Sequence, residues 1–151
     1  MNSQMRNRPE LAGTSAHKLL QRLQKLDYLV ISQNRFQRRL LLELLHGFGV
    51  RSIRETDTPE SIALDPGNYG AEVILWDWPS PDLDGLRRLC RRRAGWPPAV
   101  IVLDTLPSND MVAMAVAAGA ASIIAKPFSA KIVMSHVAHA VHQRSREVYL
   151  D

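Results

Sequence analysis

The sequence predicts an α/β fold, a three-layer sandwich in which helices cover both faces of a five-stranded parallel sheet. From residue 28 onward, short apolar segments alternate five times with segments whose apolar residues recur at helical spacing. Most strand segments are apolar throughout, as is typical of parallel strands that are buried on both faces. The 151 residues, 46% apolar and 23% charged, are enough for one domain with its own core.

Residues 1–25 are predicted to form a separate N-terminal segment. Residues 1–13 are polar and have little to bury, so we expect a tail there. A short amphipathic helix is predicted to follow, with one stripe of leucines formed by Leu19, Leu20, Leu23 and Leu26. The main domain is predicted to span residues 26–148.

Local signals predict each element of the domain in turn. The strands are the apolar runs 28–31, 50–54, 73–76, 99–103 and 121–125. The helices are predicted at 36–48, 58–64, 83–93, 108–118 and 129–148. Glycines follow or end the first, third and fourth of these helices, while Thr58 and Ser129 are predicted to cap the second and the fifth.

The composition excludes several classes of protein. The single cysteine, Cys90, excludes an intramolecular disulfide framework and a cysteine-based zinc finger. No apolar run approaches the roughly 18 residues of a membrane span. The polar N-terminus lacks the apolar centre of a signal peptide. We therefore expect a cytoplasmic protein with no membrane insertion.

The residues just after the strands are the candidates for chemistry, because ligands of parallel α/β sheets bind at the carboxyl ends of the strands. In this chain they are Ser32, Gln33, Asp77, Asp104 and Lys126.

Two segments at these positions resemble the receiver domains of bacterial two-component response regulators, of the single-domain chemotaxis type. Asp77 is followed, at the offsets found in that family, by Pro81, Asp84 and Gly85. The second segment comprises Ala118-Gly119-Ala120 and, after the fifth strand, Lys126-Pro127. The resemblance covers about residues 26–145. It implies the flavodoxin-like strand order 2-1-3-4-5 and a Lys-Pro peptide bond that is usually cis.

The resemblance also implies a chemistry for the site. Asp77 would be the phosphoacceptor, a carboxylate that attacks the phosphoryl group of a donor. In the family, Mg²⁺ is held by this aspartate, by two acidic residues after the first strand and by a backbone carbonyl. A hydroxyl after the fourth strand and the lysine at the position of Lys126 bind the phosphoryl oxygens.

The sequence departs from this pattern at four positions. Ser32 and Gln33 stand where the family has its acidic pair, and neither carries a charge. Asp104 stands where the hydroxyl is expected, so its charge would repel a phosphoryl group. Ile123 replaces the aromatic switch residue of the fifth strand. We therefore expect a degenerate pocket with no metal or other cofactor, in which Lys126 pairs with the carboxylates.

The predicted function is that of a stand-alone, atypical receiver-domain signalling protein of a two-component or phosphorelay pathway, not an enzyme. It would act by binding a sensor kinase, a phosphotransfer protein or an output protein, with impaired Mg²⁺-dependent phosphorylation. One alternative stays open, a phosphorylatable response regulator that uses Asp77 and Mg²⁺. A homodimer also stays open, because apolar residues of the helix at 108–118 would suit one if exposed.

An arginine-rich stretch on the third helix supports a further alternative, a receiver-like effector that binds cyclic di-GMP. The chain has fifteen Arg and four Lys, and five arginines fall within seven positions: Arg87, Arg88, Arg91, Arg92 and Arg93. Guanidinium groups suit phosphates and can stack on bases. A solvated basic face explains the same pattern. A nucleic-acid partner is not expected, because no helix-turn-helix pattern is present.

Overall fold

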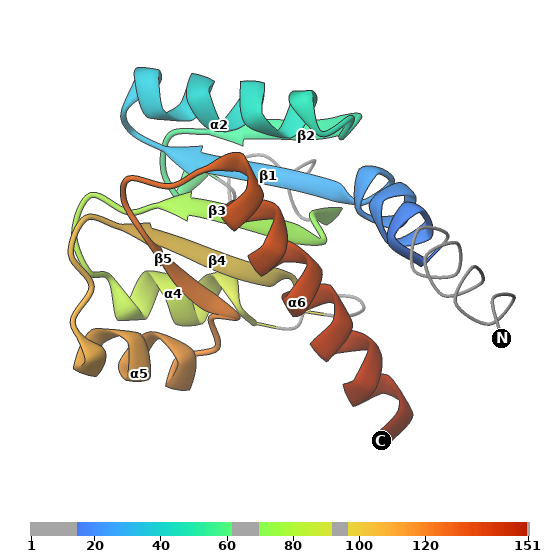
Figure 1. Ribbon diagram of the computed structural model, residues 1–151. Coiled ribbons are helices and arrows are strands. Elements are labelled where there is room, and N and C mark those ends of the chain that lie inside the picture. Colours follow the sequence, from blue (N-terminus) through green and yellow to red (C-terminus); the bar gives the residue numbers. More distant parts are fainter. Residues whose placement is uncertain (1–14, 62–69, 92–96, 151) are drawn as a thin grey trace, which may run out of the picture.

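The protein is an α/β sandwich built on one parallel sheet. The computed structural model describes residues 15–61, 70–91 and 97–150, and the backbone alone of residues 144–150. The strands lie side by side in the order β2-β1-β3-β4-β5, all parallel (Figure 1). They are β1 (Asp27–Ser32), β2 (Ser52–Thr56), β3 (Val73–Asp77), β4 (Ala99–Asp104) and β5 (Ser122–Ala125). The predicted fold class and strand order are confirmed.

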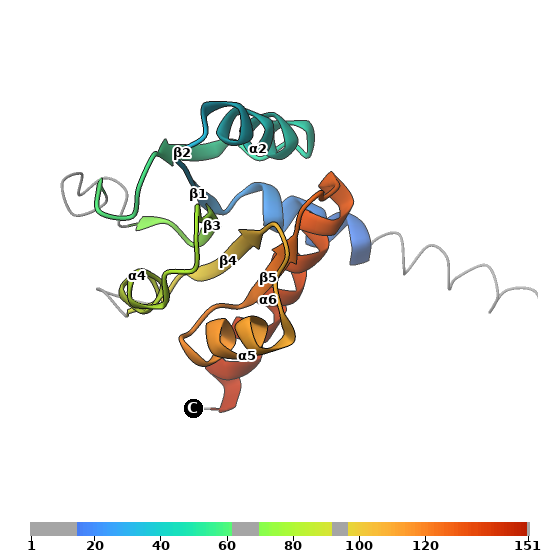
Figure 2. The same ribbon diagram turned by 90° about the vertical axis from the view of Figure 1, so that its left-hand side faces the viewer.

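Helices cover both faces of the sheet. The helices with defined bounds are α2 (Arg35–Gly47), α4 (Leu83–Leu89), α5 (Asn109–Ala117) and α6 (Ala130–Leu150). Figure 2 shows α2 and α6 on one face and α4 and α5 on the other. Among the described residues, no helix is long and apolar enough to cross a membrane.

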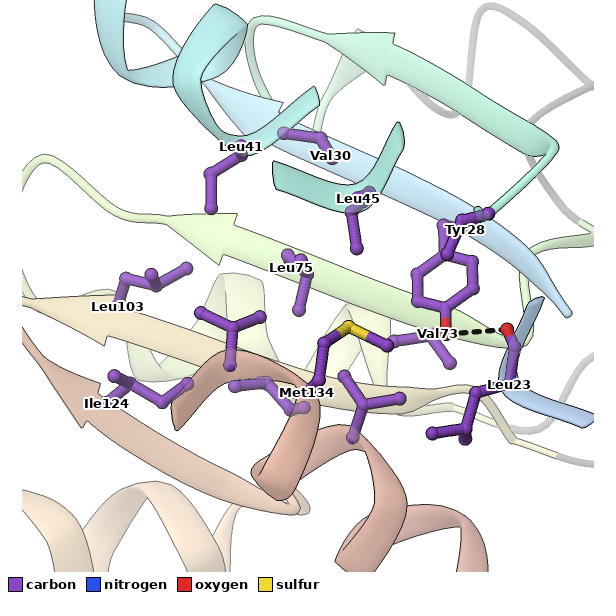
Figure 3. Packing of buried hydrophobic residues seen from close by; sticks show 14 of the residues in the cluster. Leu23, Tyr28, Val30, Leu41, Leu45, Val73, Leu75, Leu103, Ile124 and Met134 are labelled. Carbon is purple, nitrogen blue, oxygen red and sulfur yellow. Dashed lines mark hydrogen bonds between the residues drawn. The ribbon is translucent and has the colours of Figure 1, made fainter. Parts of the chain in front are cut away.

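Strands β1, β3 and β4 bury side chains on both faces, which explains why their sequences are almost entirely apolar. On β1, Tyr28 and Val30 pack toward α2 and α6, while Leu29 and Ile31 pack toward α4 and α5. The cluster on the α2 side contains Leu41 and further residues from both helices (Figure 3). Because a parallel strand carries its alternate side chains into two cores, period-2 patterning is absent from its sequence.

A helix spanning residues 15–24 precedes β1 and packs into the α2-side core. Its Leu23 is buried, and the buried hydroxyl of Tyr28 donates a hydrogen bond to the Leu23 carbonyl at 2.9 Å (Figure 3). The Gln24 amide donates to the Phe48 carbonyl at 2.9 Å and fills the space beside Gly49, whose φ is +82°. The predicted helix is therefore present and attached to the core, while Leu19 and Leu20 remain partly exposed.

The structure moves some predicted boundaries. β2 begins at Ser52, two residues later than predicted, and Val50 lies buried before it. The helix predicted at 83–93 ends at Leu89, and Cys90 is its cap. A longer helix would bring like charges together at i, i+4 spacing, including Arg87 and Arg91, which is unfavourable. Residues 62–64 of the helix predicted at 58–64 lie outside the described residues, and Pro59 and Glu60 form a turn.

Candidate functional site

The sheet register brings Ser32 and Asp77 together. These two residues are direct partners across β1 and β3, at the carboxyl ends of both strands. The loops at this edge lie toward the left in Figure 1, opposite the N-terminal helix. Both residues are buried, with exposed fractions of 0% for Ser32 and 7% for Asp77. They are the buried polar residues of a core that is otherwise apolar in the described part of the chain.

Both oxygens of the Asp77 carboxylate contact a neighbouring side chain. The Ser32 hydroxyl donates a hydrogen bond to Asp77 Oδ2 at 2.8 Å. The Lys126 ammonium forms an ion pair with Oδ1. Burial makes an unpaired carboxylate costly, and one positive charge plus one hydroxyl proton compensate for that cost.

Lys126 reaches Asp77 from the turn between β5 and α6. Its backbone N–H donates to the Asp104 carbonyl at 2.8 Å, which ties this turn to the end of β4. The Lys126–Pro127 peptide bond is cis, as the resemblance implies. The lysine side chain is 22% exposed, so water reaches this side of the ion pair.

The other predicted pocket residues are not part of this contact network. The Gln33 side chain is exposed, and the half-buried Ile123 packs on the α4 and α5 side of the sheet. The expected ion-pair cluster is only half formed, because Lys126 pairs with Asp77 and, within the described residues, Asp104 forms no ion pair. Asp104 ends β4 as predicted and is half-buried.

Sequence reasoning missed Arg38, which lies on α2 beside the pocket. Its Nη1 donates a hydrogen bond to the Ser32 carbonyl at 2.6 Å, and its Nε pairs with Glu55 Oε1 at 3.2 Å. The Arg38 side chain is 17% exposed. No signal in the sequence marks this contact, because its acceptor is a backbone carbonyl.

The loop after β3 explains the glycine of the Asp77 segment. Asp82 caps α4 by accepting a hydrogen bond from the Gly85 N–H at 2.9 Å. A side chain at Gly85 would place its Cβ 2.4 Å from Asp82 Oδ2 and displace the cap. Asp84 faces solvent and pairs with Arg87, so its described contacts are local to the helix.

The arginine-rich stretch is only partly described. Arg87 pairs with Asp84 at 2.9 Å, and Arg88 lies 3.8 Å from Glu60. Arg91 is exposed just after α4. Arg92 and Arg93 lie outside the described residues.

The pocket residues do not fit Mg²⁺, the ion that the resemblance implies. Mg²⁺ takes hard oxygen ligands, usually including one or two carboxylates. Here the carboxylate that would bind it already faces an ammonium and a hydroxyl proton, from Lys126 and Ser32. In the described ranges, no group of three or more His, Cys, Asp or Glu side chains could hold a metal ion.

No protein-family model matches the sequence, but solved structures match the fold. A two-component response regulator with a GGDEF domain superposes with a TM-score of 0.69 at 20% identity, over 82% of this chain and 52% of that one. The BeF3-activated DrrB receiver domain gives 0.64 at 21% identity, over 78% and 98% of the two chains. The chain has the receiver-domain fold. It spans about half the length of the GGDEF protein.

A third match extends this fold to a structure solved with a partner. The Saccharomyces cerevisiae receiver domain of Ssk1, crystallised with the phosphotransfer protein Ypd1, gives a TM-score of 0.60 at 14% identity. The alignment covers 73% of this chain and 84% of that one. At such identities the match shows the fold alone, so the chemistry has to be argued from the side chains of this chain.

Proposed function

We propose that this chain is an atypical receiver module of a two-component or phosphorelay pathway that signals by protein–protein interaction. In this proposal it works in the cytoplasm, is not an enzyme, and is impaired in Mg²⁺-dependent phosphorylation. One observation carries the proposal: both Asp77 carboxylate oxygens are engaged, by Ser32 and by Lys126, in a pocket with no acidic pair. A phosphoryl donor would have to displace these contacts without a divalent cation to neutralise its charge.

The partners that we propose are a sensor kinase, a phosphotransfer protein or an output protein. The Ssk1 receiver domain binds the phosphotransfer protein Ypd1, which supports this class of partner for the same fold. Apolar side chains exposed on α5, Met114 at 44% and Val116 at 50%, are available to such a partner or to a second copy of the chain.

Intact-mass measurement after incubation with Mg²⁺ and acetyl phosphate tests the proposal. We expect no phosphoryl gain in the unmodified chain. A positive control restores the family pattern with Ser32→Asp, Gln33→Asp and Asp104→Thr, and Asp77→Asn is the negative control. A gain in the unmodified chain that Asp77→Asn abolishes would show the alternative, a phosphorylatable response regulator.

The cyclic di-GMP alternative has weaker support. Of the arginines in the described part of that stretch, Arg87 and Arg88 already face carboxylates, and Arg91 is exposed. Calorimetry with cyclic di-GMP tests this alternative directly. Saturable binding that is lost in the Arg91→Ala plus Arg92→Ala variant would establish it, and no heat of binding would remove it.

A further inference from the structure

The most informative contact outside the Asp77 pair is the one between Arg38 and the end of β1. The guanidinium donates to the Ser32 carbonyl at 2.6 Å, and the Ser32 hydroxyl donates to Asp77 Oδ2 at 2.8 Å. Ser32 is therefore the one residue between the Arg38 guanidinium, which is permanently charged, and the Asp77 carboxylate. A guanidinium stays protonated at every pH at which proteins are studied.

This charge is poorly screened by water. The Arg38 side chain is 17% exposed, whereas its partner Glu55 on β2 is 49% exposed. A half-exposed carboxylate is well solvated and offsets the field of a more buried guanidinium only in part. Arg38 therefore contributes positive potential at the end of β1, which is offset in part by Glu55 and by the exposed Asp57, with which Arg38 also interacts.

A second observation points in the same direction. The N-terminus of α2 faces the same edge of the sheet, and its Asn34 cap follows Ser32 by two residues. The positive end of a helix dipole is usually paired with acidic residues, yet the first turn of α2 contains none, and Arg35 begins it. The dipole and Arg38 contribute to the potential at this end of α2 with the same sign.

We infer that Arg38 is a positioning residue that keeps divalent cations out of the pocket by holding a fixed positive charge on the Ser32 carbonyl. The inference rests on the proposed function. It assigns to Arg38 a part in preventing the binding of a divalent cation. Loss of the acidic pair removes ligands for a cation. Arg38 adds direct electrostatic repulsion, so the absence of carboxylates is not the whole cause.

The test measures Mn²⁺ binding by the quenching of indole fluorescence, because Trp76 and Trp78 flank Asp77 in the sequence and pack edge to face at 5.6 Å. The parent is the Ser32→Asp plus Gln33→Asp variant, which restores carboxylates. A second parent, Gln33→Asp alone, changes only an exposed side chain and avoids any folding defect from a buried charge. Circular dichroism confirms that each variant is folded.

Adding Arg38→Gln to either parent is expected to tighten Mn²⁺ binding by about tenfold, the size of effect expected when one partly screened charge near a divalent cation is removed. Arg38→Lys keeps the charge and should leave the affinity of the parent unchanged. Arg39→Gln is the matched control, since Arg39 lies on the same helix but is 82% exposed and pairs with Glu43. It should have no effect.

Equal affinities with Arg38 and with Gln at this position would overturn the inference and leave the proposed function intact. Lack of binding by every variant would overturn it too, because Arg38 would then not be what limits binding. Saturable Mn²⁺ binding by the unmodified chain would contradict the inference. It would also contradict the conclusion that the residues around Asp77 do not fit a divalent cation. Mg²⁺-dependent phosphoryl gain by the unmodified chain in the mass assay would contradict the proposed function and the inference together, whereas equal affinities contradict the inference alone.

Discussion

Replacing Lys126 with methionine should destabilise the protein because it leaves a buried carboxylate without its counter-charge. The Asp77 side chain is 8% exposed and that of Lys126 is 22% exposed. Removing one partner of a fully buried ion pair costs about 3–5 kcal/mol. Water at the lysine end and the remaining Ser32 hydrogen bond reduce this cost, so we expect about 2–3 kcal/mol for Lys126→Met.

Urea unfolding followed by circular dichroism measures this cost. In the Lys126→Met background, Asp77→Asn should recover part of the lost stability, because a neutral amide is cheaper to bury than an unpaired carboxylate. Lys131→Met is the matched control, since Lys131 is exposed on α6 and should change stability little. A loss below about 1 kcal/mol, the value of a surface pair, would refute the reasoning, as would a double variant no more stable than Lys126→Met.

Three further predictions concern groups outside the pocket. Tyr28→Phe should lower the free energy of unfolding by about 1–2 kcal/mol, measured in urea, because the Leu23 carbonyl loses its buried donor. Burial raises the pKa of Cys90 to about 11, so a disulfide reagent at mildly alkaline pH should label the native thiol far more slowly than the urea-unfolded one; equal rates would contradict its burial. Burial, and then the nearby His139, lower the pKa of His136. The stability it contributes is therefore present above its ordinary pKa and falls as pH drops through the folded value, and His136→Gln should flatten that part of the pH dependence of the urea midpoint.

Much of the fold could be predicted because buried strands and amphipathic helices each produce a recognisable pattern within a short stretch of sequence. The strands β1, β3, β4 and β5 were located to within one residue at each end, since their sequences are apolar runs. β2 was misplaced because its sequence is mixed, and an edge strand buries less of each side chain. The third helix was predicted four residues too long because Gly95 and Pro97 indicated its end, although its last apolar residue at helical spacing is Leu89 and arginine repulsion opposes a longer helix.

The candidate site was predicted only in part. The strand-end rule placed Ser32, Asp77, Asp104 and Lys126 at the carboxyl edge, where the structure has them. Their connections could not be predicted, because two carboxylates competed for one lysine and the sequence cannot rank their distances. Arg38 was missed because its role depends on a carbonyl, and backbone groups have no signature in the sequence.

The sequence by itself determined the alternating α/β pattern, the parallel sheet and the uncharged side chains of Ser32 and Gln33 at the end of the first strand, because each follows from residue type and local spacing. The tertiary structure alone decided which groups neutralise Asp77. That outcome depends on the β1–β3 register, which sets Ser32 opposite Asp77, and on the packing of α2, which sets Arg38 on the Ser32 carbonyl. Electrostatic energy depends on distance and solvent exposure, and both quantities are fixed only when the segments have packed together.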